Sequence, residues 1–138
     1  EALVQHAESE AVQSEMEAET AVAKFVPPDL IKHSPGVAKA WCQVTYSTGT
    51  PTLTSPDYGV ASIADTALGR LKVTWSTAFS SSVYSTPGMA SATNGGNILS
   101  FGGGDGQQTG YTEINMYNDF ATGYEDSNVE IAAFGDHS

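Results

Sequence analysis

Residues 37–47 read "VAKAWCQVTYS", and small or apolar side chains alternate there with larger polar ones. Such alternation is typical of a β-strand with one buried face, because successive side chains of a strand point to opposite faces of the sheet. Trp41 falls on the outward face, together with Lys39 and Gln43. The residues predicted to face the core are Ala38, Ala40, Cys42, Val44 and Tyr46.

The same two-residue period continues downstream. In "RLKVTWSTAF" (70–79), Leu71, Val73 and Trp75 share one face, and residues 111–119 and 129–138 alternate in the same way. Turn signals such as "TGTP" (48–51) and "TALG" (66–69) separate these segments. Six or seven short strands divided by turns predict a mainly β fold, an antiparallel, jelly-roll-like β-sandwich spanning 37–138.

The chain upstream of this domain has a different character. Residues 1–25 are rich in Ala, Glu, Gln and Met, which favour helix. Their apolar stripe is thin, and a short helix with so little to bury is marginal without a packing partner. Pro27 and Pro28 then predict a stiff, extended linker over 26–36. The organisation predicted is therefore a helical stub (1–25), a linker (26–36) and a β domain (37–138).

Charge and composition narrow the possible functions. The net charge is -11, with 16 acidic residues against five Lys and Arg, so binding to nucleic acid or to an anionic membrane surface is disfavoured. The single cysteine, Cys42, excludes an internal disulfide and a cysteine-based zinc site. The sequence contains no apolar run of about 18 residues, so no membrane-spanning segment is predicted.

No pattern in the sequence predicts catalysis. The three histidines, His6, His33 and His137, are scattered, and no nucleophile elbow accompanies them. The glycine-rich stretch "GGGDGQQTG" (102–110) lacks the lysine of a phosphate-binding loop, and its acidic residues do not match the spacing of a calcium-binding EF-hand. We therefore expect no enzyme activity, no cofactor and no metal ion.

Several segments resemble bacteriophage fibre proteins. "AVQSEMEAETAVAKFVPPDLI" is similar to a recurring tail-fibre segment, although Glu19 stands where that segment usually has glycine, which favours a helix that runs straight on into the linker. "HSPGVAKAWCQV" resembles the segment that opens a terminal β domain of these fibres, and "VEIAAFGDHS" resembles its closing segment. "YGVASIADTALGRLKVTWSTAFSS" matches the middle of the same domain.

The resemblance implies a homotrimeric fibre module located on the virion, which adheres to a host-surface glycan or another receptor. Its stub would also bind other virion proteins. The alternatives are a purely architectural head fibre or decoration trimer, and a glycan-degrading enzyme with its site at a subunit interface. The outward apolar side chain of Trp41 is expected to be covered by another group. The candidates are a neighbouring subunit, the linker and a glycan.

Two groups of residues are candidates for intermolecular contacts. A trimer would bury the stripe of the stub and the outward tryptophan: Leu3, Ala7, Ala11, Ala18 and Trp41. Receptor contacts are expected in the loops 93–110 and 121–128, which we predict to lie at the distal end of the fibre. Aromatic rings stack on sugars and amides or carboxylates bond to their hydroxyls. The candidate ligand-binding residues are Asn94, Asp105, Gln107, Gln108, Tyr111, Tyr117 and Tyr124.

Overall fold

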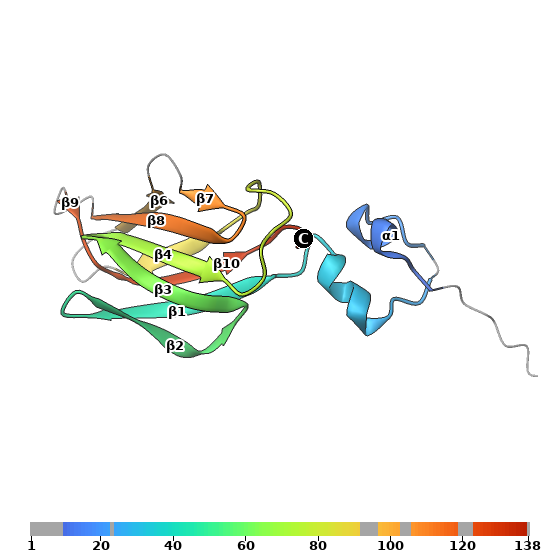
Figure 1. Ribbon diagram of the computed structural model, residues 1–138, viewed down its shortest axis with the longest axis horizontal. Helices are drawn as coiled ribbons and strands as arrows, with labels where there is room; N and C mark the ends of the chain where they lie inside the picture. The colour runs from blue at the N-terminus through green and yellow to red at the C-terminus, as the bar shows by residue number, and fades with distance from the viewer. Residues whose placement is uncertain (1–9, 23, 92–96, 103–105, 119–122, 138) are drawn as a thin grey trace, which may run out of the picture. The chain divides into compact units, whose positions relative to one another are not determined.

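The structure is a computed structural model that describes residues 10–22, 24–91, 97–102, 106–118 and 123–137 (Figure 1). The chain divides into two compact units, Glu1–Val37 and Ala38–Ser138. The second unit contains all the named strands, so the chain is mainly β. Within the described residues, no helix has the length and apolar character needed to cross a membrane.

The first unit contains only short helical segments. Helix α1 covers Gln13–Glu17, and the 3-10 helix η1 covers Pro28–His33. Between them the chain doubles back, so that the Ala11 N–H donates a hydrogen bond to the Phe25 carbonyl at 2.9 Å. Lys24 and Glu15 form an ion pair across this fold-back.

Two predictions for this unit are corrected. The helix expected over 1–25 is present, among the described residues, only over Gln13–Glu17. It ends because Glu19 adopts a left-handed conformation, with φ of 54°, so the chain turns where the fibre segment usually has glycine rather than continuing as helix. The linker is not fully extended either, because Pro28 opens η1, a position where its missing N–H costs nothing.

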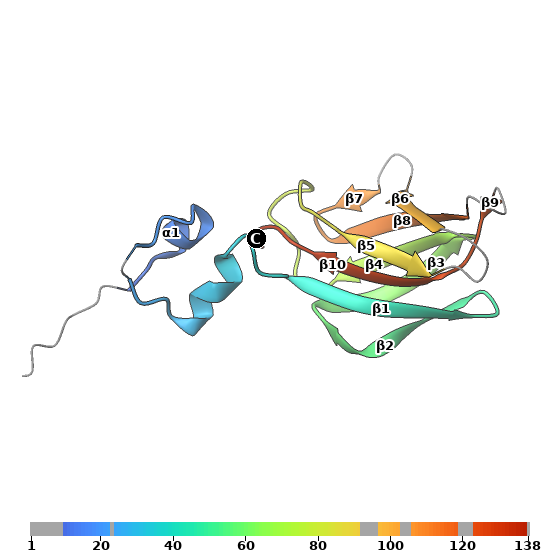
Figure 2. The same ribbon diagram turned by 180° about the vertical axis from the view of Figure 1, so that it is seen from behind.

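The second unit consists of two antiparallel sheets. One has the order β2-β1-β10-β5, and the other has the order β3-β4-β8-β6, with β7 and β9 also paired to β8. Figure 2 shows β1, β10 and β5 of the first sheet in front. The strands are β1 (Ala40–Ser47), β2 (Thr50–Tyr58), β3 (Val60–Ala67), β4 (Arg70–Trp75), β5 (Gly88–Ser91), β6 (Asn97–Phe101), β7 (Gln107–Gln108), β8 (Tyr111–Asn118), β9 (Gly123–Tyr124) and β10 (Asn128–Ala133).

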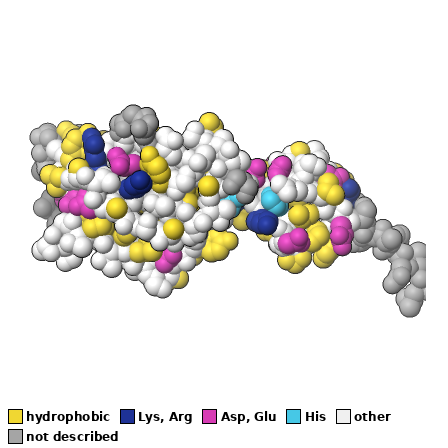
Figure 3. Space-filling model, viewed as in Figure 1, with side chains coloured by type: hydrophobic (Ala, Val, Ile, Leu, Met, Phe, Trp, Pro, Cys, Tyr) yellow, Lys and Arg dark blue, Asp and Glu magenta, His cyan; other side chains and the backbone are white. Residues whose placement is uncertain are grey.

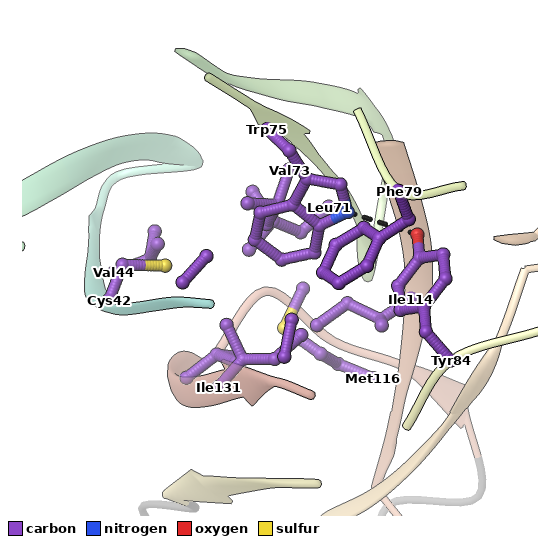
Figure 4. Packing of buried hydrophobic residues seen from close by; sticks show 13 residues of the cluster. Cys42, Val44, Leu71, Val73, Trp75, Phe79, Tyr84, Ile114, Met116 and Ile131 are labelled. Carbon is purple, nitrogen blue, oxygen red and sulfur yellow. Dashed lines mark hydrogen bonds between the residues drawn. The ribbon is translucent and has the colours of Figure 1, made fainter. Parts of the chain in front are cut away.

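The core lies between the inner faces of the two sheets (Figure 4). The predicted core face of β4 is confirmed, since Leu71 and Val73 are fully buried and Trp75 is only 4% exposed. Strands β1, β8 and β10 also bury the alternate residues that the sequence indicates. The two antiparallel sheets with a shared core agree with the predicted sandwich.

The connectivity differs from the jelly-roll-like order that we expected. Hairpin β1–β2 lies within one sheet and hairpin β3–β4 within the other. In a jelly roll, by contrast, successive strands pass between the two sheets. The two-residue alternation and the turn signals in the sequence identify strands and hairpins. They do not specify which strands, distant in the sequence, pair with one another in a sheet.

An aromatic cluster fastens the segment between β4 and β5 to the core. Phe79 and Tyr84 stack with ring centroids 4.0 Å apart, and Trp75 packs edge-on against both. The Trp75 indole N–H donates to the Tyr84 hydroxyl at 2.9 Å (Figure 4). That hydroxyl also lies 2.8 Å from the Gln108 and Tyr111 carbonyl oxygens and 2.7 Å from Thr112 Oγ1. One hydroxyl therefore links β4, β7 and β8.

Removing this hydroxyl by Tyr84→Phe is expected to lower the free energy of unfolding by about 1–3 kcal/mol, because the Trp75 indole N–H would remain buried without its acceptor. Urea denaturation followed by circular dichroism measures the change. Tyr58→Phe is the matched control, since Tyr58 is 57% exposed. Equal stability of the two variants would contradict the role assigned to the Tyr84 hydroxyl.

Candidate functional site

The predicted ligand-binding residues do not form one site. Gln107, Gln108 and Tyr111 lie where β8 begins, since β7 pairs with its first residues. Tyr117 and Tyr124 lie where β8 ends, at its pairing with β9. The rise of a strand places the two ends of β8 about 20 Å apart. Asn94 and Asp105 lie outside the described residues.

The segment 93–110 is also not a single distal loop. It contains β6 and β7, and Asn97 pairs with Asn118 at one end of the sandwich while Gln107 pairs with Thr112 toward the other. The start of β8 lies beside Thr74 of β4, at the end where β1 begins. Gln107 and Gln108 therefore lie at the end of the sandwich where β1 begins.

The predicted side chains that are described have distinct roles. The Gln107 amide donates to the Tyr84 carbonyl at 2.7 Å, so it supports the core cluster. Tyr111 lies under Lys72, whose Nζ is 3.8 Å from the ring centroid. Tyr117 and Tyr124 contact each other edge-on at 5.7 Å, and Tyr124 is 48% exposed. This tyrosine pair lies where β8 ends, at the end of the sandwich away from the start of β8.

The residues predicted for a trimer interface are also separated. Leu3 and Ala7 lie outside the described residues. Ala11 is only 3% exposed within its own chain, so it has little surface left for a second copy to contact, whereas Ala18 is exposed. Trp41 is 40% exposed on the outer face of the four-stranded sheet.

Trp41 lies in a groove on this outer face, which we call the Trp41 groove. One wall is the bulge at Ser55–Asp57 of β2, where the register shifts between Trp41 and Gln43 and the Ser55–Pro56 peptide is cis. The other wall is the start of β5 with the residue before it. The groove encloses about 680 Å³. Its lining residues are Trp41, Cys42, Gln43, Thr54, Ser55, Pro56, Pro87, Gly88, Met89, Glu130, Ile131, Ala132 and Phe134.

Two rows of outward side chains cross the sheet at the groove. In the first row, Trp41 pairs with Ala132 of β10, whose methyl group leaves space beside the indole. In the second row, Gln43 pairs with Glu130, which in turn pairs with Met89 of β5. Neighbouring outward rows of a sheet are about 7 Å apart. An aromatic surface therefore lies one row away from an amide and a carboxylate.

The polar row is held in place by a hydrogen bond. The Gln43 amide nitrogen donates to Glu130 Oε1 at 2.9 Å, and both residues are exposed. The amide oxygen of Gln43 and the second carboxylate oxygen of Glu130 take no part in this bond and carry lone pairs that can accept hydrogen bonds. The groove can thus combine stacking with hydrogen bonding.

Known proteins do not identify the chain. No family model matches it, and no significant match is found among curated proteins or solved structures. Its function must therefore be inferred from the chemistry of its surface.

The charge of the groove restricts what it can bind. Its lining includes one carboxylate, Glu130, and no Lys, Arg or His. The basic residues of β4, Arg70 and Lys72, belong to the other sheet. Figure 3 views the molecule from that side, where the few basic side chains lie among uncharged and acidic ones. Because a carboxylate and no cation line the groove and the chain has a net charge of -11, an anionic ligand is disfavoured.

The sequence singles out Trp41 as an outward aromatic residue but does not predict the walls of its groove. Pro56 and Met89 come from segments 15 and 48 residues further along the chain, and only the pairing of β2, β1, β10 and β5 brings them together. Two segments of the sequence could have indicated the walls of the groove, because a proline interrupts or precedes a strand pattern in each. They are "TSPDYG" (54–59) and "TPGM" (86–89).

On the inner side of the same sheet, burial raises the pKa of the Cys42 thiol from 9.0 to about 12, with a smaller contribution from Asp57. The folded state therefore binds this proton more tightly than the unfolded state does. Stability is unaffected below pH 9 and falls as pH rises toward 12, by about 1 kcal/mol between pH 9 and 10. Urea titrations at pH 8, 9 and 10 measure this loss.

Cys42→Ala is the control for this prediction. It removes the thiol and is expected to flatten the stability profile between pH 9 and 10 at a lower overall stability. Burial also raises the pKa of Tyr46, whose ordinary value is 10.0. The loss of stability due to Tyr46 therefore begins at a higher pH than the loss due to Cys42. An unchanged slope in Cys42→Ala would contradict the assignment to the thiol.

Proposed function

We propose that this chain is a homotrimeric β-sandwich fibre module of a bacteriophage virion that attaches the particle to a saccharide on the host surface. The likeness of its opening and closing β segments to fibre proteins supports the virion assignment. The observation that carries the binding function is Trp41, an aromatic side chain left 40% exposed in a groove of the sheet, where it contributes nothing to the core.

The division of the chain supports separate roles for its parts. The first unit is compact by itself and contains none of the strands of the sandwich, as expected for an attachment segment that binds other virion proteins. The sandwich holds its outer faces on rigid strands, which suits recognition. No step of this function requires a cofactor, a metal ion or catalysis.

Adsorption to bacteria tests the proposal. Fluorescently labelled chain is incubated with a panel of bacterial strains and with their extracted surface polysaccharides, and its mass is measured by light scattering. We expect a trimer that binds selected strains and loses binding when the surface saccharides are removed enzymatically. A monomer at micromolar concentration, or a protein that binds no strain, would overturn the proposal.

An architectural head fibre or decoration trimer is the second candidate. Met89, which lines the same groove as Trp41, is 72% exposed, and such apolar surface would also be covered by packing against another virion subunit. Cryo-electron microscopy of the particle separates the candidates. A location on the tail with free outer sheet faces supports adhesion, whereas a head location with these faces covered supports an architectural role.

A further inference from the structure

The structure points to the Trp41 groove, on the side of the sandwich, as a subsite for an uncharged pyranose unit of a host polysaccharide. This inference rests on the proposed adhesive function and replaces the distal loops as the place of recognition. A sugar ring has an apolar C–H face and a rim of hydroxyl groups. Its binding site therefore needs an aromatic surface with hydrogen-bonding groups beside it.

The two outward rows supply this pair of features at the right spacing. The exposed part of the Trp41 indole offers a stacking surface, and Ala132 beside it leaves room for the ring. One row away, about 7 Å along the strands, lie Gln43 and Glu130, which a hydroxyl group of the stacked sugar would reach. Their mutual hydrogen bond at 2.9 Å orients both groups before the ligand arrives.

The charge and size of the groove define the ligand class. Glu130 accepts hydrogen bonds from hydroxyl or acetamido N–H groups but repels carboxylated or phosphorylated sugars, and no lining cation offsets this. A volume of about 680 Å³ lies within the usual range for ligand sites of about 300–1,000 Å³. The ligand is therefore a neutral hexose or N-acetylhexosamine unit within an oligosaccharide.

A saccharide array with isothermal titration tests the inference on the full chain. The array carries hexasaccharides of glucose, mannose, galactose and N-acetylglucosamine, with polyuronate and sialylated glycans as anionic comparisons. The wild type is expected to bind at least one neutral glycan and no anionic one. Trp41→Ala should weaken this binding at least about tenfold, and Trp41→Phe should restore part of it because a stacking surface remains.

Gln43→Ala separates ligand binding from sheet packing, since the residue is exposed and lies outside the core. It should also weaken binding severalfold with unchanged circular dichroism. Tyr124→Ala is the matched control, an exposed aromatic residue on β9 in the other sheet, and it should bind like the wild type.

The outcomes distinguish this inference from the proposed function. If Tyr124→Ala abolishes saccharide binding and Trp41→Ala does not, the fibre is an adhesin but the groove is not its site. If Trp41→Ala converts a trimer into monomers, the groove is a contact between copies and the inference is overturned. If the wild type binds no saccharide on the array, the inference fails, and the adsorption experiment decides separately whether adhesion fails with it.

Discussion

Replacing Trp75 with alanine is expected to lower the free energy of unfolding by about 3–5 kcal/mol, the largest effect of any single substitution considered for this protein. The Trp75 side chain is 4% exposed and packs edge-on against Phe79 and Tyr84. Its loss would leave a cavity between the sheets, and the Tyr84 hydroxyl would lose its indole donor. Urea denaturation monitored by circular dichroism measures the change.

The matched control for this prediction is Trp41→Ala, which removes the same side chain from the outer face. Because Trp41 is 40% exposed and leaves no closed cavity, the expected cost is about 1 kcal/mol or less. Equal losses in the two variants would contradict the assignment of Trp75 to the core and Trp41 to the surface.

Gly69→Ala is expected to lower the free energy of unfolding by about 2–4 kcal/mol. Gly69 has φ of +66°, which L residues rarely adopt, and a Cβ there would lie 2.7 Å from both the Glu125 nitrogen and the Met116 oxygen. These are backbone atoms of the β8–β10 region and cannot rotate away. The Gly69 N–H also donates to Asp126 Oδ1 at 2.7 Å, so a shift of the turn would break that bond.

Gly49→Ala isolates the conformational part of this cost. Gly49 has a similar φ of +76°, but the nearest atom to its Cβ position is Asp126 Oδ2 at an ordinary 3.6 Å. Its expected cost is about 1 kcal/mol, from the backbone conformation alone. Thermal and urea denaturation of both variants would measure the difference, and a Gly49→Ala variant as unstable as Gly69→Ala would show that the contact with β8 is unimportant.

Local sequence patterns predict the strands of this protein well and its long-range arrangement poorly. The period-two pattern of Leu71, Val73 and Trp75 is a property of neighbouring residues, and the turn at Thr48 and Gly49 is equally local. Among the described residues of 1–25, helix is confined to Gln13–Glu17, because the stripe of alanines buries too little and Glu19 turns the chain. Strand order depends on pairings such as Cys42 with Ile131, which no local pattern encodes.

For the candidate site, too, the sequence predicts local features but not the contacts between distant segments. Trp41 is recognisable from the sequence as an outward aromatic residue, but the predicted loop residues are divided between the two ends of β8. Gln107 has a supporting role because it lies in β7, where its amide reaches Tyr84, a contact between residues 23 positions apart. The groove itself needs a bulge in β2 and the edge of β5, which come together only in the folded sheet.

The chain has two tryptophans, and the sandwich places them in different environments, Trp41 partly exposed on an outer face and Trp75 in the core. Their fluorescence should therefore consist of a red-shifted component from Trp41 and a blue-shifted component from Trp75. A molecule that covers the outer sheet would change the first component alone, whereas opening of the sandwich would change the second. Fluorescence quenching by acrylamide would thus report occupancy and folding independently in one unlabelled sample.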